Sequence, residues 1–87
     1  MYSLIKNYKI AGRDVMVTAV RGDYDYYGNP KYSVQVWLMN GENQGHLWSP
    51  DIKGYRKRKD DSYTLKAYDL ESDLYSFVKA FEKTIQD

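Results

Sequence analysis

A run of basic residues beside a tyrosine is the strongest indication of chemistry in this chain. We call it the basic segment, and its candidate contact residues are Lys53, Tyr55, Arg56, Lys57, Arg58 and Lys59. Because side chains alternate along a strand, Lys57 and Lys59 are expected on the face of Tyr55, and the two arginines on the other. Such a segment suits a nucleic acid, whose phosphates pair with the cations while Tyr55 or Tyr63 stacks on a base.

Three interpretations of the basic segment remain open at this point. Its cations suit the phosphates of DNA or RNA, and they suit an acidic surface on another protein equally well. The third interpretation is structural, because a lysine-rich edge strand prevents two sheets from pairing edge to edge and keeps a hairpin in solution. Direct contact with nucleic acid through the basic and aromatic strand at 53–63 is therefore one expectation among three.

An acidic and aromatic stretch before the turn Gly28-Asn29-Pro30 is the second candidate contact surface. We call it the tyrosine loop, and its residues are Asp23, Tyr24, Asp25, Tyr26 and Tyr27. Tyrosine brings a large apolar ring and a hydroxyl to a contact at low entropic cost. The carboxylates repel phosphate, and they can imitate phosphate charge in a basic groove of a protein partner. In the alternative interpretation, these tyrosines fold back over the sheet and cover Trp37.

The residue types needed for catalysis or metal binding do not converge in this sequence. The single histidine, His46, has no carboxylate at a ligand spacing, and the chain has no cysteine. A protein metal site needs three or four converging ligands. Asp60 and Asp61 are adjacent and would point to opposite faces of a strand, so a turn explains them better than acid–base catalysis. We expect no catalytic residue, no metal, no cofactor and no enzymatic activity.

Alternating apolar residues predict the sheet that positions these segments. The pattern indicates strands over about 2–10, 15–20, 31–39, 47–48, 55–59 and 62–68. In the second strand Val15 and Val17 share one face while Met16 and Val20 lie opposite, so we expect cover on both sides. Trp37 lies on the more polar side of the third strand, where a second small core is favoured over an exposed anchor.

The C-terminal part of the chain has the spacing of an amphipathic helix. Its apolar stripe consists of Leu70, Leu74, Phe77, Val78, Phe81 and Ile85. A separate short helical turn is predicted at Ser49-Pro50-Asp51, with serine as the cap and proline in the first helical position. The fold class that follows is α+β: a small antiparallel sheet of four to five strands with one C-terminal helix packed on one face.

Length and composition limit the chain to one domain, residues 1–87. The hydrophobic fraction is 43% and the charged fraction 29%, which are typical of a folded, soluble domain. A formal net charge of +1 means that electrostatic contacts act through local patches. The sequence has no cysteine, signal peptide or apolar run of the roughly 18 residues that span a membrane. We therefore expect a cytoplasmic protein without membrane contact.

The chain resembles small accessory proteins of phages and other mobile elements, including the anti-CRISPR type. The resemblance rests on its length, on loops rich in Asn, Asp, Lys and Tyr, and on the helical segment from Ser72 to Phe81. Proteins of this kind are short, cysteine-poor single domains in which a small sheet often packs against one helix. The strand order is also similar to the arm-binding domains of recombinases, although Tyr68-Asp69-Leu70-Glu71 replaces the threonine and paired lysines expected there.

These observations lead to two functional hypotheses. The first is a non-enzymatic binding protein that blocks or modulates a protein partner, one that itself handles nucleic acid, as the anti-CRISPR resemblance implies. The tyrosine loop and the basic segment are its expected contact surfaces. The alternative is a direct nucleic-acid-binding module that uses the basic segment, and the salt dependence of binding distinguishes the two.

Overall fold

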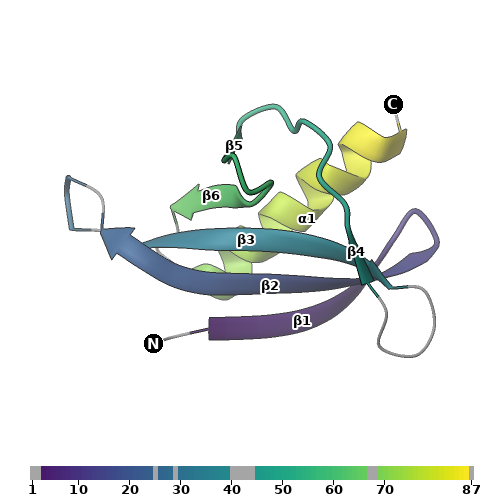
Figure 1. Ribbon diagram of the computed structural model, residues 1–87, viewed down its shortest axis with the longest axis horizontal. Helices are drawn as coiled ribbons and strands as arrows, with labels where there is room; N and C mark the ends of the chain where they lie inside the picture. The colour runs from purple at the N-terminus through teal and green to yellow at the C-terminus, as the bar shows by residue number, and fades with distance from the viewer. Residues whose placement is uncertain (1–2, 25, 29, 40–44, 67–68, 87) are drawn as a thin grey trace.

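The protein has two layers, an antiparallel sheet and one helix that crosses a single face of it (Figure 1). The computed structural model describes residues 3–24, 26–28, 30–39, 45–66 and 69–86. The elements are β1 (Ser3–Ile10), β2 (Arg13–Tyr24), β3 (Pro30–Met39), β4 (Gly45–Leu47), β5 (Arg56–Lys57), β6 (Tyr63–Lys66) and α1 (Leu70–Gln86). The α+β class is thus confirmed, with six strands among the described residues in place of the expected four or five.

The strand order is β1-β2-β3-β6-β5, and β3 is the central strand. One edge of β3 pairs with β2, and its other edge is shared between two short strands. Residues 31–34 of β3 pair with β6, and residues 37–39 pair with β4. The chain between β4 and β5 therefore leaves the sheet and returns at the outer edge of β6.

A two-residue turn, Ala11-Gly12, joins β1 to β2 in register with the pair Ile10 and Arg13. Both turn residues have positive φ, 52° at Ala11 and 78° at Gly12. Two consecutive residues with positive φ are typical of the type I′ turn, whose twist matches that of the flanking strands. This turn fixes the register of β1 against β2.

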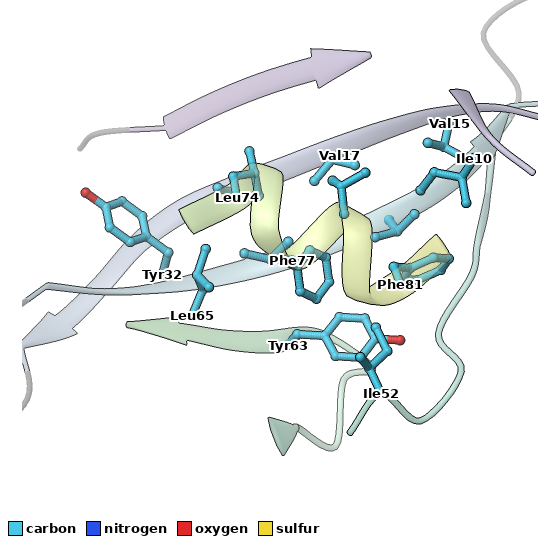
Figure 2. Packing of buried hydrophobic residues seen from close by; sticks show 14 of the residues in the cluster. Ile10, Val15, Val17, Tyr32, Ile52, Tyr63, Leu65, Leu74, Phe77 and Phe81 are labelled. Atoms are coloured by element: carbon cyan, nitrogen blue, oxygen red, sulfur yellow. The ribbon is translucent and has the colours of Figure 1, made fainter. Parts of the chain in front are cut away.

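The hydrophobic core fills the space between the sheet and α1 (Figure 2). Alternate residues of the strands enter it, because successive side chains of a strand point to opposite faces. The sheet contributes Ile10, Val15, Val17, Ala19, Tyr32, Val34, Val36, Tyr63 and Leu65. The helix contributes its apolar stripe, and Phe77 and Phe81 are completely buried. The predicted helical stripe is therefore the side that packs on the sheet.

Asp69 caps the start of α1 through two reciprocal hydrogen bonds. The Ser72 N–H donates to Asp69 Oδ1 at 3.5 Å, and the Asp69 N–H donates to Asp73 Oδ2 at 3.3 Å. This arrangement is a variant of the capping box, because the side chain that accepts from the cap's own N–H belongs to Asp73, one residue beyond the usual third helical position. The carboxylate of Asp73 is thereby held near the positive end of the helix dipole.

Two expectations about the chain between β3 and α1 are wrong. Ser49-Pro50-Asp51 forms no helical turn, and the segment has no regular secondary structure. The Trp48 N–H donates to Val36 O at 2.8 Å, and the buried Tyr63 hydroxyl donates to Pro50 O. The expected strand at 55–59 is reduced to β5, since the chain turns after Arg58, whose N–H donates to Ser62 O at 2.8 Å.

The sheet face opposite α1 is open in the part of the chain that the structure describes. Val20 of β2 is 37% exposed and Ile5 of β1 is 63% exposed. The expectation that β2 is covered on both sides is therefore wrong for the described residues, in which α1 is the one helix and covers only one face. Trp37 lies on the open face, partly exposed, and is not part of the core between the layers.

Candidate functional site

The two arginines of the basic segment lie on the open face of the sheet. Arg56 is the register partner of Thr64, which alternates with the buried Tyr63 and Leu65 of β6. Arg58 reaches back across the sheet: its Nε donates to Thr64 Oγ1 at 3.0 Å and its Nη1 donates to Ser33 Oγ at 3.2 Å. The hydroxyl acceptors carry no charge, so these bonds orient the guanidinium of Arg58 without neutralising it.

Lys57 points to the opposite side, as the alternation predicts, and has a structural role. Its Nζ donates to Ser49 O at 2.9 Å and lies 3.2 Å from Asp51 Oδ1. These contacts hold β5 against residues 49–51 of the preceding segment. Lys53 and Lys59 are exposed.

The expectation that Tyr63 stacks on a base is wrong, because its ring is fully buried against the helix, whereas Tyr55 is only partly buried, so a base contact by Tyr55 stays a prediction. Tyr63 has no exposed surface, and its ring centroid lies 5.1 Å from that of Phe77. Tyr55 packs edge-on against the same phenylalanine at 5.0 Å. Burial, and secondly the nearby Asp73 carboxylate, raise the pKa of the Tyr55 hydroxyl. Both tyrosines belong to the packing of β5 and β6 on α1.

A groove of about 820 Å³ runs along the outer edge of β6, between β5 and the first turns of α1. Its cationic lining comes from three strands and the turn after β5: Lys31, Arg56, Lys57, Arg58, Lys59 and Lys66. Among the described residues that line it, the one carboxylate is that of Asp73. We call this feature the basic groove. It opens there because β5 pairs only with residues 63 and 64 of β6, leaving the edge of Leu65 and Lys66 uncovered by the described strands.

Lys31 and Lys66 are site residues that the sequence analysis missed. They are direct register partners in the β3–β6 pair, although 35 positions (66 − 31) separate them in the chain. Like charges directly opposite each other in a sheet destabilise it, so this pair favours an anion between or above the two ammonium groups. Nothing in the local sequence around either lysine indicates the pairing, because strand partners depend on the tertiary fold.

The end of β2 that leads into the tyrosine loop lies beside the start of β3, where Lys31 and its partner Lys66 line the basic groove. Figure 1 shows β2 and β6 ending on the same side of the molecule. Tyr24 is the last residue of β2 and pairs with Pro30, directly before Lys31. Tyr26 and Tyr27 are 96% and 84% exposed, and their rings meet edge to face at 5.4 Å. They do not cover Trp37, so that interpretation is wrong for these two tyrosines. Asp23 lies within β2, next to its last residue. Asp25 lies outside the described residues.

The residues considered for catalysis do not form a site. His46 is exposed on β4, opposite Leu38. The described residues contain no group of three or more His, Cys, Asp or Glu side chains that could hold a metal ion. Asp60 belongs to a turn, in which its Oδ1 accepts hydrogen bonds from Ser62 N at 3.1 Å and Ser62 Oγ at 2.6 Å. These bonds lower the pKa of the Asp60 carboxyl.

Fold and surface together define a small α+β protein with a cation-lined groove at one sheet edge. Comparison of the chain with protein-family models, with curated proteins and with solved structures found no match in any of the three. The resemblance to mobile-element proteins therefore stays a prediction. The one helix of the described chain, α1, lacks the length and apolar character that crossing a membrane requires.

Proposed function

We propose that this protein is a non-enzymatic module that binds nucleic acid through the basic groove. The observation that carries the proposal is the convergence of cations from β3, β5 and β6 on one edge, where a single carboxylate accompanies them. The proposal keeps the role expected for Arg56, Arg58 and Lys59, and it adds Lys31 and Lys66. Phosphates placed along this edge replace repulsion between like charges with charge-assisted hydrogen bonds.

Arg58 is the residue best prepared for such a contact. Its guanidinium has five N–H donors, and the bonds to Thr64 and Ser33 use two of them. The side chain is thus oriented before a ligand arrives, which lowers the conformational entropy lost on binding. The remaining donors are available to a phosphate oxygen in bidentate geometry.

The test is oligonucleotide binding as a function of salt. We expect binding at low salt, with log K falling linearly against log salt at about 0.7–0.9 per phosphate contact. Arg58→Gln and Lys66→Gln should each weaken binding and reduce the magnitude of that slope by about 0.7–0.9, the contribution of one phosphate contact. Lys83→Gln, which removes an exposed cation from the last turn of α1, is the matched control and should change neither. Absence of any binding at low salt overturns the proposal.

A second candidate function is inhibition of a protein that handles nucleic acid, the role implied by the anti-CRISPR resemblance. The exposure of Tyr26 and Tyr27 favours it, because aromatic rings at the tip of a hairpin suit contact with a protein.

The test of the second candidate is purification of the complex from the native host, followed by an assay of the captured protein. Double replacement of Tyr26 and Tyr27 by alanine should abolish capture and inhibition while leaving the unfolding midpoint unchanged, since neither ring is buried. If the double variant still captures and inhibits the partner, the tyrosine loop is not the contact surface.

A further inference from the structure

The open face of the sheet carries an apolar groove beside its basic residues. The groove has a volume of about 360 Å³ and is lined mainly by Ile5, Met16, Thr18, Val20, Gln35 and Trp37. Its polar lining is uncharged, consisting of hydroxyls and one amide. Flat apolar side chains combined with neutral hydrogen-bonding groups suit the faces and edges of nucleobases.

The register aligns this groove with the anchored arginine. Ser33, Gln35 and Trp37 follow one another on the open face of β3, because they alternate with the buried Val34 and Val36. Ser33 accepts the hydrogen bond from Arg58, while Trp37 is the register partner of Met16 and of Leu47. At the rise of a strand, Ser33 and Trp37 are about 13 Å apart. A strand of nucleic acid held at Arg58 can therefore lay its next bases over Gln35 and Trp37.

Charge on the open face is almost entirely of one sign. The strand positions that register places there, together with Arg58, include the cations Lys9, Lys31, Arg56, Arg58 and Lys66. Among the described residues at the strand positions, the one carboxylate is Asp14, which lies directly opposite Lys9, and the carboxylate of Asp60 in the turn after β5 interacts with the charge of Arg58. Acidic residues of α1, such as Glu71 and Asp73, belong to the other layer. A polyanion is therefore the occupant whose charge complements this face.

From these observations we infer that the protein binds single-stranded nucleic acid across its open sheet face, with an unpaired base stacked on Trp37. The inference rests on the proposed function and adds the class of nucleic acid. A duplex hides its base faces in its own stack, so it would leave the apolar groove unfilled. Unpaired bases present their apolar faces, which stack on aromatic side chains with little dependence on sequence.

Tryptophan fluorescence tests the inference, because Trp37 lies on the open face and Trp48 lies on the side of the sheet that α1 covers. Trp48 packs edge-on against Phe81 of α1 at 5.1 Å, so it serves as the internal control. In a Trp48→Phe variant, a single-stranded homopolymer of deoxythymidine should quench the emission of Trp37. In a Trp37→Phe variant, the emission of Trp48 should change little. The wild-type protein should bind the single strand about tenfold more tightly than a duplex of equal length.

A second pair of variants does not depend on replacing a tryptophan. Ile5→Glu places a carboxylate at a 63% exposed position of the open face, and Tyr75→Glu places one at a 55% exposed position of α1. The first should weaken single-strand binding about tenfold and the second should leave it unchanged. Circular dichroism of both variants checks that they fold.

Four outcomes overturn the inference in distinguishable ways. Salt-dependent binding without any change in Trp37 emission removes the stacking role but leaves the proposed function intact. If the protein binds a duplex as tightly as a single strand, the preference for single-stranded nucleic acid is contradicted, while the proposed function remains intact. A dimer in sedimentation that Ile5→Glu dissociates, with oligonucleotide binding unchanged, assigns the open face to a second copy of this chain. No binding of either nucleic acid removes both proposals.

Discussion

At the scale of single residues, the basic segment divides into side chains with different tasks. Lys57 holds β5 in place through contacts with Ser49 and Asp51, whereas Arg58 is oriented by the neutral hydroxyls of Thr64 and Ser33. The same alternation sends Tyr55 inward against Phe77. A row of cations that looks uniform in sequence therefore contains one structural lysine among candidate ligand-binding residues.

Asp60 gives a residue-scale prediction with a defined sign in pH. Its folded-state pKa lies below the ordinary value because Ser62 donates two hydrogen bonds to the carboxylate. The stability that this group contributes is present above its unfolded-state pKa and is lost as pH falls through the folded-state pKa. Asp60→Ala should therefore lower the unfolding midpoint near pH 7, and the difference from wild type should shrink in acid.

The matched control for this prediction is Asp60→Asn, which keeps an oxygen acceptor that does not titrate. It should retain part of the stability at pH 7 and show less dependence on acid. Chemical denaturation of the three proteins between pH 7 and pH 3 provides the measurement. A difference between wild type and Asp60→Ala that stays constant over this range contradicts the assignment.

At the scale of elements, the turn between β1 and β2 holds the edge of the open face in register. Ala11 has a positive φ of 52°, a conformation that strains any residue with a Cβ and that asparagine and glycine adopt more easily. The exposed alanine at this position thus leaves the hairpin less stable than its geometry permits.

Ala11→Asn should raise the free energy of unfolding by about 0.5–1 kcal/mol, because Asn-Gly is a preferred type I′ turn. Gly12→Ala should lower it by about 1–2 kcal/mol, since φ is 78° there. No atom lies within 4 Å of a Cβ built at Gly12, so the cost is purely conformational. Urea denaturation measures both, and equal stabilities for all three proteins would contradict the turn assignment.

The helix α1 provides a second prediction at this scale. Phe77 is fully buried and meets Tyr55, Tyr63 and Phe81. Phe77→Ala should cost about 3–5 kcal/mol, a large part of the stability of a domain of this size. Tyr75→Ala, at a 55% exposed position of the same helix, should cost less than about 0.5 kcal/mol. Comparable losses in thermal denaturation would contradict the packing of α1.

At the scale of the whole molecule, the two layers differ in charge although the net charge of the chain is only +1. Cationic side chains such as Lys31, Arg56 and Lys66 lie together at the edge of the open sheet face, while the first turn of α1 contains Glu71 and Asp73. The small net charge in the sequence conceals this separation, because it sums residues that the fold places on opposite sides. Binding of a polyanion is a property of one face.

Ligand binding to that face should also stabilise the folded molecule as a whole. Single-stranded DNA at about one hundred times its dissociation constant adds about 2.7 kcal/mol, which corresponds to a rise in Tm of roughly 10–20 °C for a domain of this length. The effect should fall with added salt, because the phosphate contacts weaken. An Ile5→Glu variant at the same DNA concentration should show a smaller rise. Differential scanning calorimetry that finds equal shifts for both proteins contradicts a site on the open face.

Local periodicity in the sequence was enough to predict the layers of this protein. The spacing from Leu70 to Phe81 predicts the buried stripe of α1, and alternation from Lys31 to Met39 predicts the faces of β3. Both patterns arise from the geometry of a single element, in which neighbours along the chain determine which side chains share a face. The two-face division of the basic segment follows from the same rule.

Only the tertiary structure decided which strands are neighbours and which face α1 covers. The pairing of Lys31 with Lys66 joins segments 35 positions (66 − 31) apart, and no local pattern encodes it. The burial of Tyr63 and the partial exposure of Trp37 depend on α1 lying on one face. Alternation assigns residues to two faces, but only packing determines which of the two faces is buried.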